Sequence, residues 1–431
     1  MKIETPSALK DWQAKPVGDI FEINSETLPN STSTDFCFRY ITLESVYSER
    51  IDFESVQQIR FGEAPSRARR AIKRGDILVS TVRPNLQGFA EFQPPDDEPY
   101  VCSTGFAVLR AKNGHDQQFY LQQLLSDFGA SQFHAYVTGT NYPAISDRDF
   151  ARLKLLVPKD KLEKDSSTAL KDIAATITAT RESIAKAERL QKGLMQQLLT
   201  GHLKPDGSPR RDSDFKADDH FGRLPRSWQS ARVKNLIASC EYGLSRAMSA
   251  HGQYPIFRMN NIERGRMVAS PLAYIDLSPE DFARYRVRKG DILFNRTNTI
   301  ELVGKVGIFA LVGDFVFASY LVRLVANEEN DPRFLNYYLN SFEGQKRVAT
   351  KVTPSIGQAN INTSSLKSVW AVKPPLDEQS AIADRLDSIH ELICAKEQKT
   401  AALQRLKKSL MQNLLTGRIR LPASAAPRKG K

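Results

Sequence analysis

The sequence lacks the features that mark metal sites, disulfide frameworks and membrane segments. Its four cysteines, Cys37, Cys102, Cys240 and Cys394, form no Cys-x-x-Cys pair and have no histidine cluster nearby, so neither a zinc site nor a disulfide framework is indicated. No run of about 18 apolar residues occurs, and the N-terminus lacks the apolar core of an export signal. We therefore expect a protein of the reducing cytoplasm, with no metal site.

The motifs of common catalytic sites are also missing. The chain has no Gly-x-x-x-x-Gly-Lys-Ser/Thr phosphate loop, no glycine fingerprint opening a helix, no His-Glu-x-x-His and no Gly-x-Ser-x-Gly. Asn141-Tyr142-Pro143-Ala144 resembles the Asn-Pro-Pro-aromatic signature of amino-methyltransferases, but the second proline and the aromatic residue are misplaced. We predict no catalytic residues and no cofactor bound by this chain.

What the chain has in excess is positive charge. Its 431 residues include 61 Lys and Arg against 49 Asp and Glu, a net charge of +12. The length suits two or three domains, and a hydrophobic content of 41% is typical of globular proteins. Because nucleic acid is the polyanion that a basic cytoplasmic protein meets most often, the charge favours a nucleic-acid partner.

An internal repeat organises the chain. Leu194 to Gly201 reads LMQQLLTG, and Leu410 to Gly417 in the second half reads LMQNLLTG. Trp12-Gln13 returns as Trp228-Gln229 at the same offset, and Gly75 to Leu78 (GDIL) returns as Gly290 to Leu293 at an offset one position shorter. The chain is therefore two diverged copies of one unit, with single-position length changes in loops.

A long helix is predicted ahead of each octamer. Each segment is rich in helix formers and free of proline, which predicts about 30 helical residues and about 45 Å in each half. A mostly apolar stripe recurs at alternate steps of three and four, which is the spacing of a helix that packs on another helix; packing on the helix's own globular core is the alternative. Its positions are 173, 177, 180, 184, 187, 191, 194 and 198 in the first segment and 389, 393, 396, 400, 403, 407, 410 and 414 in the second. The polar Gln191, Lys396 and Lys407 indicate that the pairing is imperfect or continues into another protein. The residues predicted for helix pairing or partner docking are Ile173, Ile177, Ile184, Leu194, Leu198, Ile389, Ile393, Leu403, Leu410 and Leu414.

Each half also predicts a mixed α/β globule. The Gly-Asp pairs are expected to be turns, with Asp76 and Asp291 as caps, that lead into strands. Val101 to Leu109 and Val316 to Leu324 are predicted strands, and short helices follow. We expect globular domains at 1–158 and 222–375, long helices at 159–203 and 376–420, a linker at 204–221 and a disordered tail at 421–431.

Three polar regions in the sequence suit DNA. The run Ser66 to Arg74 holds five cations that can contact phosphates. Amide and guanidinium groups near the predicted strand ends can bond base edges, and the polar loops before Ile145 and Ile361 allow close backbone approach. Solvated faces and ordinary surface turns are the alternatives. The candidate DNA-binding residues are Arg67, Arg69, Arg70, Lys73, Arg83, Asn85, Thr140, Asn141, Tyr142, Asn295, Arg296, Asn298, Ser355, Gln358 and Asn360.

These features together resemble the specificity (S) subunit of type I restriction-modification systems. The resemblance rests on the repeated octamer, the repeated Gly-Asp-Ile-Leu, Pro374 to Gln379 (PPLDEQ) before the second helix, and Gly357 to Ile361 (GQANI). The first half departs at both of the last two places. Pro158 lacks a following Pro-Leu-x-Glu-Gln, and Asn141 to Ile145 (NYPAI) replaces the Gly-Gln-x-Asn-Ile form.

The resemblance implies an α/β (α+β) fold with two target recognition domains, held apart by long helices that pair as an antiparallel coiled coil. Each domain would read one half of a bipartite DNA target across a fixed gap. The helices would dock methyltransferase (M) subunits, expected to be two, which use S-adenosylmethionine, and the assembly would recruit restriction (R) subunits that use ATP and Mg. The S subunit itself is non-catalytic.

Two other function classes remain open from the residues alone. The chain could be a fused methyltransferase or nuclease with unrecognised catalytic residues, which methyl transfer by the isolated chain would support. It could also be a coiled-coil scaffold that binds only protein, which a lack of sequence-selective DNA affinity would support.

Overall fold

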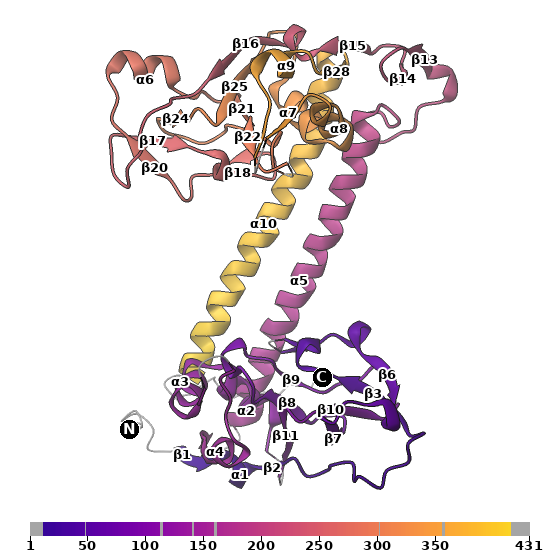
Figure 1. Ribbon diagram of the computed structural model, residues 1–431, viewed down its shortest axis with the longest axis vertical. Coiled ribbons are helices and arrows are strands. Elements are labelled where there is room, and N and C mark those ends of the chain that lie inside the picture. The colour runs from indigo at the N-terminus through magenta and orange to yellow at the C-terminus, as the bar shows by residue number, and fades with distance from the viewer. Residues whose placement is uncertain are drawn as a thin grey trace, which may run out of the picture. The chain divides into compact units, whose positions relative to one another are not determined.

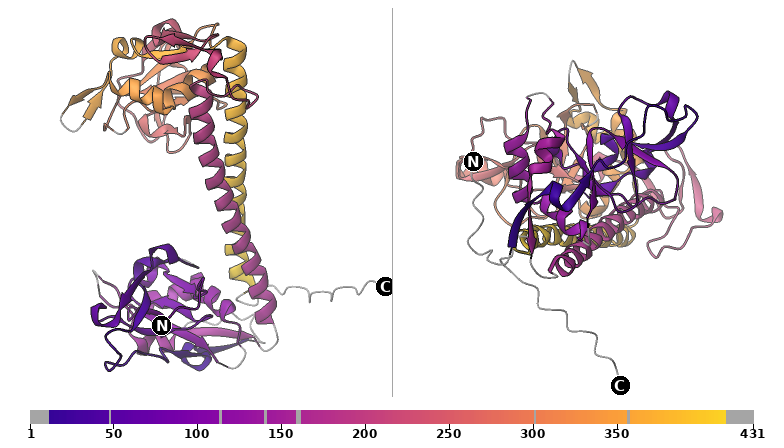
Figure 2. Two further views of the ribbon diagram at one scale, coloured as in Figure 1. Left: turned by 90° about the vertical axis from the view of Figure 1, so that its right-hand side faces the viewer. Right: turned by 90° about the horizontal axis from the view of Figure 1, so that it is seen from below.

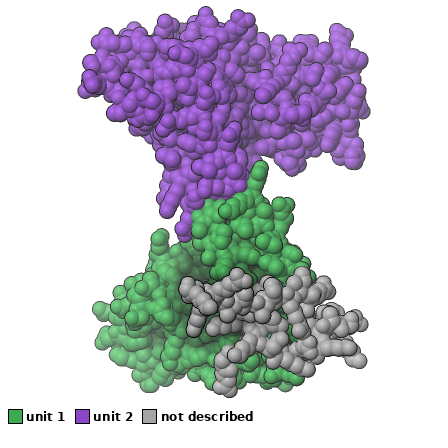
Figure 3. All heavy atoms as spheres, turned by 180° about the vertical axis from the view of Figure 1, so that it is seen from behind, with its two compact units in different colours: residues 1–181, 398–431 green, residues 182–397 purple. Residues whose placement is uncertain are grey.

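The computed structural model describes residues 12–47, 49–112, 115–139, 142–158, 162–300, 302–355 and 358–414. They fall into two compact units (Figure 3). Unit 1 comprises residues 1–181 and 398–431, and unit 2 comprises residues 182–397. Each long helix therefore begins in one unit and ends in the other. Among the described residues, no helix is both long enough and apolar enough to cross a membrane.

Unit 1 is built on two four-stranded sheets within its described residues (Figure 1). The first has the order β2 (Phe21–Ile23), β11 (Phe106–Ala111), β8 (Ile77–Ser80), β9 (Phe89–Glu91), and the second has the order β6 (Gln57–Arg60), β3 (Cys37–Ile41), β10 (Tyr100–Ser103), β7 (Ala68–Ile72). Two-stranded pairs are β1 (Trp12–Pro16) with β12 (Lys154–Pro158) and β4 (Val46–Tyr47) with β5 (Arg50–Ile51). The helices are α1 (Val17–Ile20), α2 (Gln117–Leu125), α3 (Asp127–Tyr136), α4 (Asp147–Arg152) and the start of α5 (Leu162–Leu199).

Unit 2 has a six-stranded sheet in place of the first of these (Figure 1). Its order is β16 (Ile237–Tyr242), β25 (Leu321–Ala326), β21 (Ile292–Asn295), β23 (Val306–Ile308), β19 (Arg266–Met267), β18 (Ile262–Glu263). Smaller sheets are β20 (Ala273–Ile275), β17 (Tyr254–Phe257) and β24 (Val316–Phe317); β15 (Gln229–Arg232) with β28 (Trp370–Lys373); and β13 (Phe215–Asp218) with β14 (Gly222–Pro225). The helices are α6 (Pro279–Tyr285), α7 (Pro332–Asn340), α8 (Phe342–Ala349), α9 (Thr363–Lys367) and the start of α10 (Leu376–Leu414).

The repeat seen in the sequence is also a repeat of strand register. In unit 1, Ile77 pairs with Leu109, and in unit 2 the equivalent Ile292 pairs with the equivalent Leu324. Gln13 pairs with Val157 in the same way as Gln229 pairs with Lys373. The two units therefore share one framework, and the expected mixed α/β halves are confirmed.

The strand after each Gly-Asp turn is apolar on both faces because it lies between two layers. Ile77 and Val79 of β8 face a core formed with helices α2 and α3, whereas Leu78 faces the core beneath the second sheet. In β21, Ile292 and Phe294 face one core and Leu293 the other. Successive side chains of a strand point to opposite faces, so a central buried strand appears as a continuous apolar run.

The predicted turns at the two aspartates are confirmed, and two predicted strands are corrected. Asp76 accepts the Lys73 N–H at 2.8 Å, and Asp291 accepts the Arg288 N–H at 2.8 Å. Residues 101–109, expected as one strand, contain parts of the separate strands β10 and β11, and residues 316–324 contain β24 and part of β25. An intervening turn divides each segment between two sheets, which β-propensity alone does not reveal.

The predicted stripes on the long helices are the faces that the structure buries. Positions 173, 177, 180, 184, 187, 191, 194 and 198 of α5 are all buried or half-buried, and so are 389, 393, 396, 400, 403, 407, 410 and 414 of α10. In unit 2 the end of α5 and the start of α10 lie side by side (Figures 1 and 2), where Leu198 and Ile382 share one core. All ten residues predicted for helix pairing lie on these stripes.

The repeated octamers anchor the helix ends in the globular cores. Leu198 and Leu199 are 0% and 2% exposed in the main core of unit 2, which also contains the fully buried Trp228. Leu410 and Met411 pack against the corresponding core of unit 1. The octamer thus attaches each helix to the unit in which it ends.

The stretch expected as a linker, 204–221, is instead a folded part of unit 2. It contains β13, and Arg210 within it forms an ion pair with Glu378 at the start of α10. Gln379 of the Pro374 to Gln379 segment is 1% exposed, donates to the Pro374 carbonyl at 2.8 Å and accepts the Asp331 N–H at 3.0 Å. The charge of Arg210 is therefore used in a contact within the fold. The predicted tail at 421–431 lies outside the described residues.

We expect Leu198→Ala to lower the free energy of unfolding of unit 2 by about 2–5 kcal/mol, because it leaves a cavity in the core. Leu190→Ala is the matched control on the same helix: Leu190 is 57% exposed, and its truncation should change stability by less than about 0.5 kcal/mol. Urea denaturation followed by tryptophan fluorescence measures both. Equal shifts in the two variants would contradict this placement of the octamer.

Candidate nucleic-acid interface

In unit 2 a small sheet gathers several predicted contact residues. Strand β27 (Gln358–Asn360) pairs with β22 (Thr297–Asn298) on one side and with β26 (Thr353–Ser355) on the other. Asn360 is opposite Thr297 and Thr353, and Gln358 is opposite Ser355. The sheet joins the predicted strand-end group and the predicted polar loop, which are far apart in sequence.

Arg296 connects this sheet to the six-stranded sheet. Its carbonyl accepts the Ile361 N–H at 2.9 Å, and its guanidinium donates to Asn360 Oδ1 at 3.2 Å. The guanidinium also lies 4.9 Å from the ring centroid of Tyr242, which is 41% exposed. Burial acts to raise the pKa of Tyr242, but the hydrogen bonds from Thr363 and the charge of Arg296 outweigh it and lower that pKa.

The two asparagines beside Arg296 have different roles. Asn298 lies at the surface of the unit. Its amide donates to Met259 Sδ at 3.2 Å, and its Oδ1 accepts the Thr299 N–H at 2.9 Å. Asn295 is 1% exposed, and its amide donates to the Leu302 carbonyl at 3.1 Å. The prediction of a DNA contact at Asn295 is therefore wrong, because the side chain is used inside the unit to hold the following turn.

Unit 1 has the same connection with different side chains. The Ile145 N–H donates to the Thr81 carbonyl at 2.9 Å, as the Ile361 N–H does to the Arg296 carbonyl in unit 2. Val82 also pairs with Ala144 in an isolated antiparallel β-bridge. The Arg83 guanidinium lies 4.6 Å from the ring centroid of Tyr142, which is 71% exposed. Asn85 is exposed nearby in sequence. Thr140 and Asn141 lie outside the described residues.

The basic run of unit 1 is divided between surface and interior. Arg67 is exposed, the Arg69 guanidinium lies 4.6 Å from the Phe61 ring, and Lys73 forms an ion pair with Glu26. Arg70 is 9% exposed, pairs with Asp147 at 3.0 Å, and also donates to Asn24 and to the Phe106 carbonyl. The prediction for Arg70 is corrected, because alternation along β7 turns its side chain inward.

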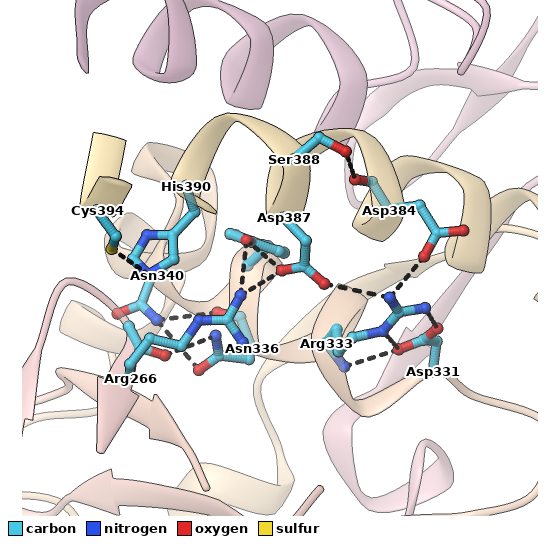
Figure 4. A network of polar contacts seen from close by, with 12 residues as sticks. Arg266, Asp331, Arg333, Asn336, Asn340, Asp384, Asp387, Ser388, His390 and Cys394 are labelled. Atoms are coloured by element: carbon cyan, nitrogen blue, oxygen red, sulfur yellow. Dashed lines mark hydrogen bonds and ion pairs between the residues drawn. The ribbon is translucent and has the colours of Figure 1, made fainter. Parts of the chain in front are cut away.

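A polar network attaches α10 to the globular part of unit 2 (Figure 4). Asp387 accepts from Arg266, from the Tyr337 hydroxyl at 2.6 Å and from Arg333 at 3.1 Å. Arg333 also pairs with Asp384 at 2.6 Å and with Asp331 at 2.7 Å. Burial, followed by the hydrogen bond to Asp387, raises the pKa of Tyr337. This network fixes the helix against β19 and α7.

Arg264, at the turn between β18 and β19, joins both long helices. It pairs with Glu188 of α5 at 3.0 Å and with Glu397 of α10 at 2.5 Å. The hydrogen bond with Glu397 is the main cause of its raised pKa. Sequence reasoning missed Arg264, Arg266 and Arg333, since single arginines in loops and short strands carry no pattern that identifies their acidic partners.

Sequence reasoning also missed three exposed, largely apolar side chains of unit 2, Tyr242, Met259 and Tyr320. They are 41%, 37% and 42% exposed. Met259 contacts Asn298, and the Tyr320 carbonyl accepts the Arg296 N–H at 3.0 Å.

Among the described residues, no group of three His, Cys, Asp or Glu side chains could hold a metal ion. The polar segments offer amides, guanidinium groups and aromatic rings, which suit base edges and phosphates.

Comparison with known proteins identifies this arrangement. Residues 9–189 and 225–405 each match the family described as type I restriction modification DNA specificity domain. A Methanocaldococcus jannaschii protein named as the putative specificity subunit of type I restriction enzyme MjaX is 30% identical over 48% of this chain and 49% of its own length. The match thus spans about half of that relative. The MjaVIII specificity subunit of the same organism is 27% identical over 70% of each chain.

Solved structures share the fold. The S subunit of a type I restriction-modification system from M. genitalium has a TM-score of 0.58 at 10% identity, covering 96% of this chain and 98% of that one. A chain from a study of complex assembly and conformational transition of a type I system has a TM-score of 0.55 at 23% identity, covering 95% and 99%. The chain therefore belongs to the type I restriction-modification DNA specificity family, whose members are non-catalytic subunits with two target recognition domains.

Proposed function

We propose that this chain reads a bipartite, asymmetric DNA target in two halves separated by a fixed gap. One observation carries the proposal: equivalent backbone hydrogen bonds, Ile145 to Thr81 and Ile361 to Arg296, hold polar segments of different composition in the two units. Unit 1 presents Arg83, Asn85 and Tyr142 there, and unit 2 presents Asn298, Gln358 and Asn360. One scaffold with two different polar surfaces suits two different half-sites.

In this proposal the chain acts in the cytoplasm and holds no cofactor of its own. A methyltransferase partner supplies S-adenosylmethionine, and a restriction partner uses ATP and Mg. The net charge of +12 supports attraction to DNA phosphates, which contributes affinity at any sequence. Selectivity then has to come from the side chains that reach base edges.

Selection from a randomised duplex pool tests the proposal. The chain, in complex with the methyltransferase subunit encoded with it, is mixed with the pool, and the bound DNA is sequenced. We expect two short defined motifs around an undefined gap of fixed length. Enrichment of no motif by a stable complex would contradict the proposed function and favour a protein-binding scaffold.

The length of the gap is expected to follow the length of the paired helices. Inserting one heptad into α5 between Ile177 and Ile184, and one at the matching place in α10, keeps the buried stripes in register. Each helix then lengthens by about 10 Å, which corresponds to about three base pairs. We expect the selected gap to lengthen by about that amount.

The control for this experiment is the same heptad inserted into the turn between Lys204 and Ser208, which closes with a Gly207 N–H to Lys204 carbonyl bond of 2.9 Å. This insertion leaves both helices unchanged, so the gap should stay constant. If the variant with a heptad in both α5 and α10 still selects both half-motifs but with an unchanged gap, the helix length does not set the gap length.

Gln358 is expected to contribute to one half-site only. Its side chain is exposed on β27, and loss of an amide that bonds a base edge costs about 1–3 kcal/mol and relaxes the preference at that position. Gln358→Ala should therefore relax one position of one half-motif and leave the other half-motif unchanged. Gln398→Ala, an exposed glutamine of α10, is the control. Equal weakening at all sequences would assign Gln358 to a phosphate contact.

We further propose that each unit docks one methyltransferase subunit on a repeated helix surface. Arg189 and Leu190 on α5 recur as Arg405 and Leu406 on α10, at the same offset as the repeated octamer. All four side chains are exposed; Leu190 is 57% and Leu406 is 48% exposed. Identical residues with no role in the unit's own core suit two equal sites for two copies of one partner.

Each leucine of this surface is expected to hold one partner copy. Leu190→Glu and Leu406→Glu should each reduce the assembly from two methyltransferase subunits to one, because a carboxylate cannot be buried unpaired in an apolar contact. Native mass spectrometry counts the copies. Leu392→Glu is the control, since Leu392 is 49% exposed and its repeat counterpart is Thr176. Retention of two copies by all three variants would place docking elsewhere.

A further inference from the structure

Each unit exposes a large aliphatic side chain in the turn after its central strand. Leu86 in unit 1 is 68% exposed, and Ile300 in unit 2 is 65% exposed. Leu86 follows Gly75, and Ile300 follows Gly290, at nearly the same distance along the chain from the repeated Gly-Asp-Ile-Leu. A lone exposed aliphatic residue is uninformative, but exposure at similar places in two diverged units suggests a shared use.

The turn of unit 1 is held in a strained conformation. It is a single 3-10 turn, Pro84–Leu86, between Arg83 (φ 50, ψ 52) and Gln87 (φ 52, ψ 40), both left-handed although neither is glycine. The Gln87 side chain donates to the Leu125 carbonyl of α2 at 3.0 Å and fixes the turn on the helix. Strain of this kind persists where the surroundings enforce it, and it gathers at functional sites.

The turn of unit 2 is held by a different set of hydrogen bonds. The Leu302 and Val303 N–H groups donate to the Thr299 carbonyl at 3.1 and 2.9 Å, and Asn295 holds the Leu302 carbonyl at 3.1 Å. Val303 is 6% exposed and anchors the turn in the core. In this turn Ile300 is the most exposed aliphatic side chain, Leu302 is 37% exposed, and Val303 is buried.

Both aliphatic tips stand beside the segments proposed to contact DNA. The Leu86 N–H donates to the Arg83 carbonyl at 2.9 Å, and the Arg83 guanidinium covers Tyr142. Ile300 follows Asn298 and Thr299, and Asn298 contacts the exposed Met259. An exposed aliphatic side chain beside cationic and amide groups matches the chemistry of side chains that enter a duplex between base pairs.

We propose that Leu86 and Ile300 are wedges, each of which inserts between two neighbouring base pairs of one half-site and unstacks that step. This inference rests on the proposed function. Insertion adds selectivity without hydrogen bonds to bases, because pyrimidine–purine steps unstack more easily than other steps. Each half-motif then contains one flexible step that the polar side chains of the unit do not need to read.

Fluorescence of 2-aminopurine in the selected duplex tests the wedges. The probe replaces in turn each adenine of either strand except the adenine that the complex methylates, and the complex contains the full chain with its methyltransferase. We expect increased fluorescence at one step in each half. Leu86→Ala should remove the increase in one half only, Ile300→Ala in the other half only, and each should weaken binding by about 10-fold.

Two further variants separate insertion from a general loss of binding. Leu86→Met keeps a long apolar side chain and should retain the unstacking signal, whereas Leu392→Ala removes an exposed leucine of α10 (49% exposed) and should change neither signal nor affinity. A split motif with no unstacking at any step would overturn the wedges and leave the proposed function intact. Weaker assembly of Leu86→Ala with the methyltransferase in the absence of DNA would also overturn them, since it assigns Leu86 to a protein contact.

Discussion

The arrangement of each unit depends on one strand that is buried on both faces. The Gly-Asp turn starts this strand, with Asp76 or Asp291 capping the backbone at 2.8 Å, and apolar residues of β8 or β21 fill two cores at once. A strand held this firmly fixes where the chain emerges at its far end. At that end, one backbone hydrogen bond holds the polar loop. It runs from the Ile145 N–H to the Thr81 carbonyl in unit 1 and from the Ile361 N–H to the Arg296 carbonyl in unit 2. The core thus determines the place of the polar segments, and the loops determine their chemistry.

The long helices obey a second constraint, which the repeated octamer satisfies. Each helix has to bury a stripe along its length and then end in a globular core, and Leu198 and Leu199 or Leu410 and Met411 provide that end. In unit 2, Arg264 adds ion pairs to both helices, and Asp387 receives Arg266, Arg333 and Tyr337. Arg264 and Asp387 each have more than one partner of opposite charge, so loss of one partner does not leave either charge unpaired.

The sequence alone predicted the parts of this structure that depend on periodicity and on duplication. The two halves, the helix stripes and the aspartate turns are confirmed, because a repeat at a nearly constant offset reports the same register twice. Single polar residues were predicted less well. Arg70 and Asn295 were expected to contact DNA but are buried, since composition does not indicate which face of a strand a side chain occupies. Tyr242 and Arg264 were missed, because their partners lie far along the chain.

The central claim is that the two equivalent segments, one in each unit, are the surfaces that meet the target. Hydrogen–deuterium exchange of the methyltransferase complex, with the selected duplex and with a scrambled duplex, tests it most directly. We predict target-specific protection of amides at residues 82–88 and 142–145 in unit 1 and at residues 296–303 and 358–361 in unit 2. Protection confined to one unit, or located away from these segments in both, would contradict the account.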